Sequence, residues 1–189
     1  MLFNHLKKVS LLPFHVTDYS TTKHVEPPEI SFSEEIGYKI SEFCKKSREV
    51  MIRCSIGKTI VTVRIIYENI KDMKSFSKQI LFILQYMISI TDCHLEELNI
   101  VFYLLDYPKQ LPETWTETLP TPEKYHVNSG MCLTLNHSST IHIWRKQEIM
   151  KVFIHEMIHA LSLDVIPTPE IIHNHYLEKY GNQLTIIQI

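Results

Sequence analysis

Hydrophobic residues in the first half of the chain recur with the period of a helix in two segments. Over residues 33–45, Ile36, Ile40 and Phe43 fall on one side of a helix, and two glutamates stand near the start of the segment. Residues 71–90 carry a longer apolar pattern, whose most hydrophobic part is too short to span a bilayer. The two patterns predict two helices, the second of them buried in the core.

Segments rich in β-branched and aromatic residues lie between and after these helices. Residues 50–54 and 59–67 are separated by a short turn that contains glycine, which predicts a hairpin. Residues 99–105 predict a further strand, and residues 131–135 and 140–144 predict two short strands joined by a polar turn. A long loop with several prolines precedes these last two strands, and loops of this length often carry function.

The C-terminal part of the chain returns to the helical period. Residues 146–163 predict a helix, and a Thr-Pro pair predicts the start of a final helix over residues 168–180. The first 30 residues contain several breakers and predict an irregular N-terminal arm, residues 1–30. No shift of composition divides the remainder. We therefore expect a single α+β domain over residues 31–189.

The composition of the chain excludes some classes of function but does not identify one. The chain has 189 residues, 44% of them hydrophobic, and a formal net charge of −2, which argues against a protein that grips nucleic acid through its phosphates. The four cysteines lack zinc-finger and CxxC spacing and are typical of buried thiols in a reducing compartment. The N-terminus is not a good secretory signal. These features predict a cytoplasmic protein that binds neither nucleic acid nor membranes.

The candidate chemistry lies in the pentapeptide His155-Glu156-Met157-Ile158-His159, an HExxH motif. On a helix, residues four apart lie on the same side, so both imidazoles point in one direction and could hold one Zn²⁺ ion. Glu156 would then reach a water molecule on the metal rather than the metal itself, and it could accept a proton from that water.

The surroundings of the motif strengthen this hypothesis. Apart from Glu156 and the two histidines, no ionisable residue occurs between Val152 and Leu163, and an unpaired His-Glu-His set in an apolar helix would be costly without a metal. The segment Val152–Leu161 resembles the extended motif of the zincin metallopeptidases, which has Val or Thr three places before the first His and uncharged neighbours. The resemblance implies a zincin-like α+β fold. In that fold a small mixed sheet with an antiparallel edge strand packs on a long helix and on the HExxH helix.

The third metal ligand decides the zincin subclass. Metzincins continue the motif with Gly and a further His, but Ser162 and Val165 stand at those positions. Gluzincins use a Glu on a following helix, and Glu178 follows His159 after 18 intervening residues, a spacing similar to that of the aminopeptidase branch. The resemblance therefore implies a Zn²⁺ site formed by His155, His159 and Glu178.

Other residues compete with Glu178 as the third ligand. His175 lies one turn earlier on the same predicted helical face, and His173 is close to it in sequence. Asp164 is poorly placed if its helix continues, because five residues turn a helix by about 140° from the direction of His159. A thermolysin-like gluzincin has Asp four places after the ligand Glu, but this chain has Asn182 there, which implies a different support for the zinc-bound histidine.

The resemblance also extends to the strand before the HExxH helix. Zincins place an antiparallel edge strand there, with which a peptide substrate pairs, and residues 140–144 stand in the corresponding place. Thr140, His142 and Trp144 would share one face of this strand and are candidate substrate contacts; an ordinary half-buried face is the alternative. The region from Asn128 to Asp164 also resembles uncharacterised HExxH proteins of large DNA viruses, which implies a location in the host cytoplasm.

The resulting hypothesis is a metallopeptidase with one Zn²⁺ per chain that hydrolyses a peptide or protein substrate with Glu156 as general base. A catalytically silent zincin-like binding module and a non-peptide zinc hydrolase are the alternatives. Most gluzincins carry a further helical subdomain after the third ligand, whereas this chain ends soon after Glu178. We therefore expect either a minimal zincin or a fragment.

Overall fold

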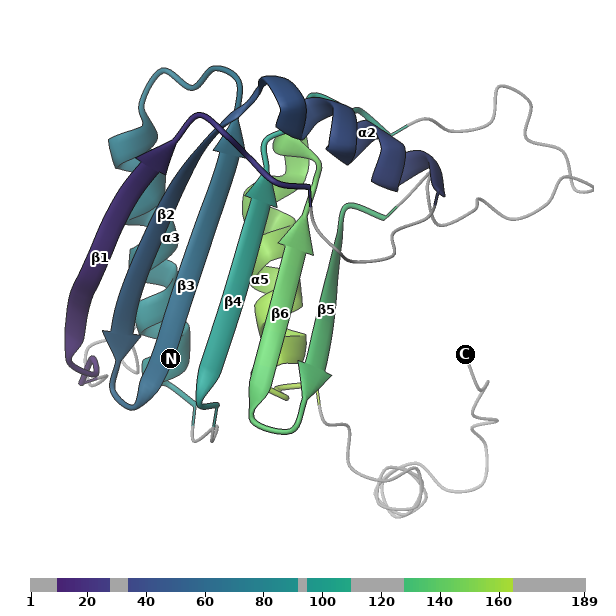
Figure 1. The fold of residues 1–189 in the computed structure, drawn as a ribbon. Coiled ribbons are helices and arrows are strands. Elements are labelled where there is room, and N and C mark those ends of the chain that lie inside the picture. Colours follow the sequence, from purple (N-terminus) through teal and green to yellow (C-terminus); the bar gives the residue numbers. More distant parts are fainter. Residues whose placement is uncertain (1–9, 28–33, 92–94, 110–127, 165–189) are drawn as a thin grey trace, which may run out of the picture.

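A six-stranded mixed sheet with three α-helices makes up the part of the chain that the computed structural model describes, residues 10–27, 34–91, 95–109 and 128–164 (Figure 1). The strands are β1 (Phe14–Thr22), β2 (Arg48–Ile56), β3 (Thr59–Tyr67), β4 (Glu97–Tyr103), β5 (Gly130–Leu135) and β6 (Ser138–Ile143). The helices are α2 (Glu34–Lys46), α3 (Met73–Ser89) and α5 (Ile149–Ala160), the last preceded by a 3-10 turn, η1 (Lys146–Glu148). The expected α+β class is confirmed.

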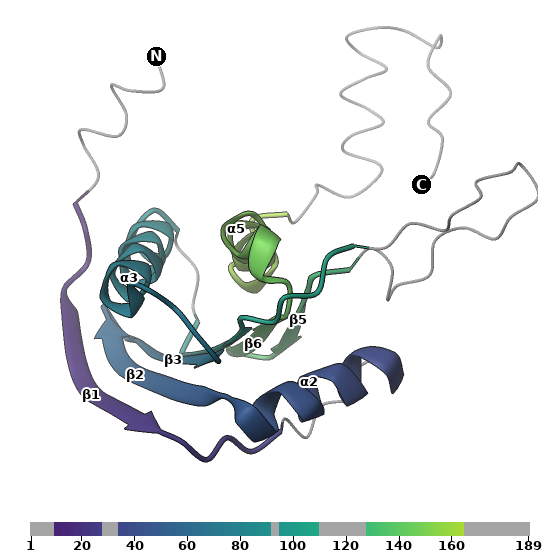
Figure 2. The same ribbon diagram turned by 90° about the horizontal axis from the view of Figure 1, so that it is seen from above.

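The sheet has the strand order β1-β2-β3-β4-β6-β5. The three N-terminal strands are antiparallel neighbours, β4 is parallel to both β3 and β6, and β5 is antiparallel to β6. Seen from above, α3 and α5 cover one face of the sheet and α2 covers the other (Figure 2). The parallel pairs require chain crossovers, and α3 provides the one between β3 and β4.

The larger core lies between the sheet and the pair α3 and α5. Ile80 and Leu84 of α3 are fully buried there, and the Phe102 and Phe153 rings meet edge to face with centroids 5.3 Å apart. A smaller cluster under α2 includes Tyr103 and other buried residues of the opposite sheet face. Because both faces of β4 are covered, five of its seven residues are buried, as is typical of a parallel strand.

The predicted helices and strands within the described residues are all present, with ends that differ by at most three residues. Residues 71–90 contain α3, which begins after Asp72, whose carboxylate accepts a hydrogen bond from the Ser75 backbone N–H at 2.9 Å. The helix predicted over residues 168–180 lies outside the described residues. None of the described helices is long and apolar enough to cross a membrane.

The prediction of an irregular arm over residues 1–30 is wrong for its central part. Residues 14–22 form β1, which pairs along its length with β2. Almost all of its side chains are exposed, so hydrophobic alternation gave no sign of a strand. The strand is held by backbone hydrogen bonds to β2, and its content of Val, Thr and Tyr was the available signal.

The assignment of residues 140–144 as the edge strand is also wrong. β6 lies in the interior of the sheet between β4 and β5, and β5 forms the edge. Trp144 directly follows β6, and only 3% of either His142 or Trp144 is exposed. Thr140, His142 and Trp144 are therefore not on a free edge. Short apolar strands buried on both faces differ little in sequence from edge strands, and only the pairing partners distinguish them.

Candidate metal centre

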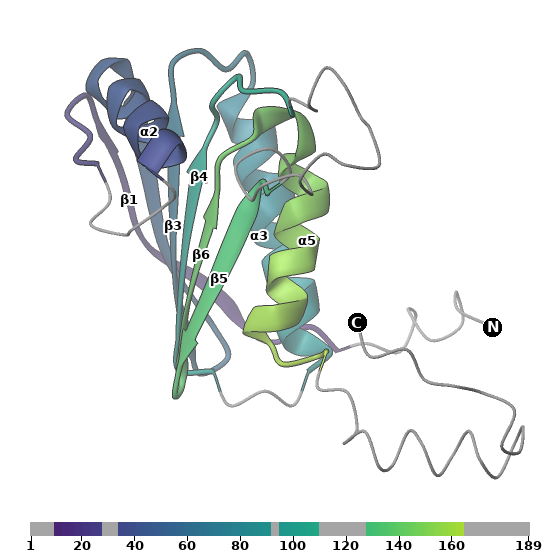
Figure 3. The same ribbon diagram turned by 90° about the vertical axis from the view of Figure 1, so that its right-hand side faces the viewer.

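The HExxH sequence lies in the last two turns of α5, which packs against β5 and β6 (Figure 3). The side of α5 toward the sheet carries Phe153, Met157 and Ala160, all essentially buried. His155 and His159 are exposed on the side away from this core. The helix is thus anchored by its apolar stripe, and this stripe fixes the direction of the histidine pair.

The two histidines converge on one point. Their Nε2 atoms are 3.1 Å apart, and the ring planes are nearly perpendicular with centroids at 4.7 Å. Two imidazole nitrogens bound tetrahedrally to one zinc ion at 2.0–2.1 Å would be separated by about 3.3 Å. The observed separation between Nε2 of His155 and Nε2 of His159 fits a shared zinc ion with little rearrangement.

Asp164 holds the outer nitrogen of His159. The carboxylate oxygen Oδ2 lies 2.5 Å from Nδ1 of His159, and this hydrogen bond lowers the pKa of Asp164. An Nδ1–H that donates to Asp164 leaves the lone pair of His159 on Nε2, the atom that faces His155. The arrangement matches the carboxylate–histidine pairs that orient metal ligands.

The end of α5 explains why the geometric argument against Asp164 does not hold. The angle of about 140° applies only to a continuous helix, but α5 ends at Ala160. Ser162 adopts a left-handed conformation with φ of 53°, and the Leu163 N–H donates to the Ile158 carbonyl at 2.9 Å, as in a Schellman motif. This reversal of the chain brings Asp164 back to His159.

Glu156 points toward the start of β5 rather than into solvent. Only 7% of it is exposed, and burial raises the pKa of its carboxyl group, with an opposing effect from the two histidines. A Cβ atom placed on Gly130 would lie 3.1 Å from Oε1 of Glu156 and only 2.5 Å from Cγ1 of Val152. The absence of a side chain at Gly130 therefore creates the space for Glu156.

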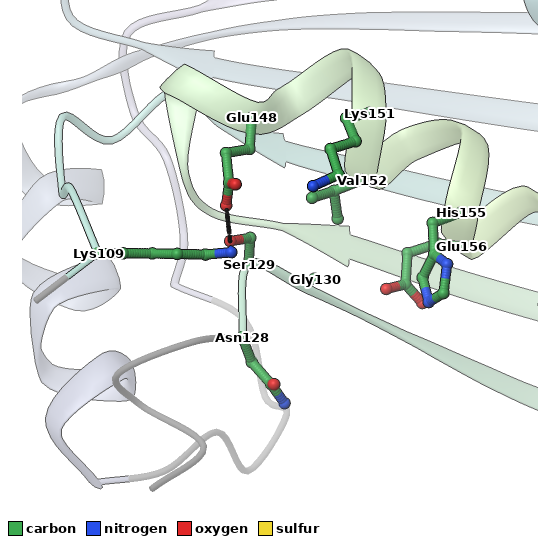
Figure 4. Close-up of a pocket in the computed structure, with 9 residues that line it drawn as sticks. All are labelled: Lys109, Asn128, Ser129, Gly130, Glu148, Lys151, Val152, His155 and Glu156. Carbon is green, nitrogen blue, oxygen red and sulfur yellow. Dashed lines mark hydrogen bonds and ion pairs between the residues drawn. The ribbon is translucent and has the colours of Figure 1, made fainter. Parts of the chain in front are cut away.

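A pocket of about 370 Å³ opens beside this carboxylate (Figure 4). Its lining residues come from α5, from η1, from the start of β5 and from the segment after β4. They are Lys109, Asn128, Ser129, Gly130, Glu148, Lys151, Val152, His155 and Glu156. The pocket and the histidine pair thus share His155, so a molecule in the pocket would lie beside the candidate metal position.

Arg145 fixes the chain on both sides of this pocket. Its guanidinium donates to the Tyr107 carbonyl at 2.9 Å and to the Asn128 carbonyl at 3.0 Å, and it lies 4.5 Å from the centre of the Tyr107 ring. Only 1% of Arg145 is exposed. Neither Arg145 nor Gly130 was predicted from the sequence as a site residue. A glycine at the start of a strand can mark a close approach of two backbones, but a lone arginine before a helix carries no such signal.

The remaining predicted ligand positions cannot be placed. Glu178, His175 and His173 all lie outside the described residues. Within the described part of the chain, no group of three or more His, Cys, Asp and Glu side chains is arranged to hold a metal ion. The described site therefore contributes two histidines and their carboxylate partner, and the third ligand stays a prediction.

Comparisons with family models, with curated proteins and with solved structures each gave no match to this chain. The zincin resemblance therefore stays a hypothesis that rests on the HExxH helix and its surroundings.

Proposed function

We propose that this protein is a zinc-dependent metallopeptidase. The observation that carries the proposal is the 3.1 Å separation of the His155 and His159 Nε2 atoms beside a buried Glu156. A zinc ion held by this pair would supply a Lewis acid that polarises a substrate carbonyl and lowers the pKa of a bound water. Glu178 is the proposed third ligand, with His175 as its substitute.

Each of the described site residues has a distinct task in this proposal. His155 and His159 bind the metal through Nε2, and Asp164 keeps His159 in the required tautomer through Nδ1. Glu156 accepts a proton from the attacking water and later delivers it to the leaving amine. Its burial supports this task, because a carboxylate with a raised pKa is a better base and, once protonated, remains available as an acid.

The edge strand β5 takes the place that sequence analysis gave to residues 140–144. β5 is antiparallel to β6, and its outer side pairs with no other strand among the described residues. Gly130 brings the start of β5 against α5 at Glu156. An extended peptide added to this edge would run past the HExxH helix, as the resemblance to zincins implies.

Two measurements on the purified protein test the proposal. We expect about one zinc ion per chain by elemental analysis, and cleavage of a broad peptide library detected by mass spectrometry. Glu156→Gln should keep the zinc but lose cleavage, because Gln is nearly isosteric and cannot accept the proton. Failure to bind zinc when it is supplied would refute the proposal. Zinc binding with equal inactivity of both proteins would favour a catalytically silent binding module.

A further inference from the structure

The pocket beside Glu156 has an excess of positive charge at one end. Lys151 lies on α5 four residues before His155, so both side chains leave the helix on the same side. Lys109 lines the pocket from the segment that follows β4. Apart from Glu156, the only carboxylate among the lining residues is Glu148, so two lysines face one carboxylate at this end.

Glu148 is already engaged with other partners. Its Oε2 atom accepts a hydrogen bond from the Ser129 hydroxyl at 2.6 Å and lies 2.9 Å from Nζ of Lys109 (Figure 4). These contacts and the nearby charge of Lys151 lower the pKa of Glu148, so it stays ionised. Lys109, Glu148 and Ser129 therefore form a group at the pocket wall whose net charge is close to zero, and their mutual contacts fix the three side chains.

The charge of Lys151 is not neutralised by this group, because the Glu148 carboxylate is paired with Lys109. Within the described residues no carboxylate oxygen lies within 4.0 Å of its Nζ atom, although its charge acts on Glu148 from further away. An ammonium group at the rim of a pocket attracts anions, and the attraction is stronger where protein walls exclude part of the water. The pocket therefore favours a negatively charged group near Lys151.

We propose that this pocket is a specificity subsite that binds the carboxylate side chain of an Asp or Glu residue beside the cleaved bond. The proposal rests on the proposed peptidase function. Four residues of helix separate Lys151 from His155 by about 6 Å along the axis. An extended peptide advances about 3.3 Å per residue, and the length of an Asp or Glu side chain adds to this reach, so a side chain next to the reacting carbonyl can cover the distance.

The identity of the other lining groups supports an acidic side chain over the alternatives. Val152 is the only hydrophobic side chain among the lining residues, so the pocket offers few partners to a large hydrophobic side chain. A basic side chain at the Lys151 end would meet the charge of Lys151, and the carboxylate at that end, Glu148, is already paired with Lys109. The carboxylate of a bound Asp or Glu side chain would form an ion pair with Lys151 and would leave the Lys109–Glu148 pair in place.

The test uses binding, so that it does not depend on catalysis. The protein is the full chain with Glu156→Gln, loaded with zinc. The probes are fluorescent eight-residue peptides of Ala and Val in which one Glu or one Gln is placed at each position in turn. Fluorescence anisotropy at low salt should show one position at which the Glu peptide binds about fivefold more tightly than its Gln counterpart. The difference should shrink as salt screens the charges.

Charge reversal identifies the residue responsible. Adding Lys151→Glu should abolish or invert the preference for the Glu peptide, whereas Lys78→Glu should leave it unchanged. Lys78 is a matched control because it is exposed on α3 and does not line the pocket. The subsite proposal is overturned if no peptide binds, if no position shows a preference, or if the preference survives Lys151→Glu.

Cleavage of the same peptides by the wild-type chain separates the two proposals. Cleavage without any preference for Glu would overturn the subsite and leave the peptidase proposal standing. A Glu preference in binding that depends on Lys151, without cleavage of any peptide, would overturn the peptidase proposal and support the subsite as a peptide-binding site.

Discussion

Histidines lie on both sides of the sheet, in opposite surroundings. On the α2 face, His142 is 3% exposed, stacks on the Tyr103 ring and lies 3.3 Å from the Tyr103 hydroxyl through Nδ1. On the α5 face, His155 and His159 are exposed and aim Nε2 at each other. The difference lies in the elements that hold them, an interior strand for His142 and the outer side of a helix for the pair.

This contrast shows how the same residue type serves packing in one place and candidate chemistry in another. Burial, with a smaller contribution from Arg64, lowers the pKa of His142 to about 4, so this imidazole is neutral at pH 7 and remains inside the fold. His155 and His159 can reach a ligand from solvent without opening the core. We therefore expect substitutions of His155 or His159 to change zinc binding, and substitution of His142 to change the stability of the fold.

The largest effect on metal binding is expected from His155→Ala. Because only two described side chains aim nitrogen at the metal position, loss of one should weaken zinc binding at least 100-fold, measured by competition with a chelating dye. His142→Asn should leave zinc affinity unchanged. An equal loss of zinc affinity in His155→Ala and His142→Asn would contradict the proposal that only the α5 histidines bind zinc.

The largest effect on catalysis is expected from Glu156→Gln, because loss of a positioned general base lowers turnover by roughly 10²–10⁴-fold. Zinc content should stay the same. Peptide turnover measured on the cleaved library substrates, next to zinc content, checks this prediction. Turnover close to that of wild type would exclude Glu156 as the base.

A smaller effect is expected from Asp164→Asn. The amide still occupies the space but loses the charge that orients His159, and such outer partners typically contribute 10–100-fold to metal affinity. Asp18→Asn on β1 is the matched control, since Asp18 is exposed on the far edge of the sheet. Equal zinc affinity of both variants would show that Asp164 has no part in the site.

Gly130→Ala should lower turnover about tenfold while zinc stays bound. The added methyl group would meet Val152 and Glu156, so the carboxylate must move, and a shift of about 1 Å is costly in catalysis. Overpacking should also lower the free energy of unfolding by about 1–3 kcal/mol, measured by urea denaturation. A companion change, Val152→Ala, relieves the closest contact and should recover part of the stability.

The last predicted effect concerns the stability of the fold and not the site. Below pH 6.5 the unfolded chain protonates His142, whereas the folded chain resists protonation until about pH 4. The stability present above pH 6.5 should therefore be lost as the pH falls, by up to about 3 kcal/mol at pH 4. Urea denaturation across this range should show a weaker pH dependence for His142→Asn than for wild type, and no change for the exposed His15→Asn.

Periodicity was sufficient to predict most of the described helices and strands, because each buries a stripe or a face against the core. It failed for β1, whose side chains are exposed, and for the position of β6, because strand order depends on distant pairing. The HExxH pattern predicted that His155 and His159 share a side of a helix. The contact of Asp164 with His159 could not be predicted, because it depends on Ser162 ending the helix in a left-handed turn.

Arg145 ties together two chain segments beside the pocket that lie far apart in the sequence. By bonding the carbonyls of Tyr107 and Asn128, one guanidinium fixes the points at which the chain leaves and re-enters the described fold. The border of the pocket therefore depends on a buried residue that does not line it, and loss of the Arg145 guanidinium would release the Tyr107 and Asn128 segments together.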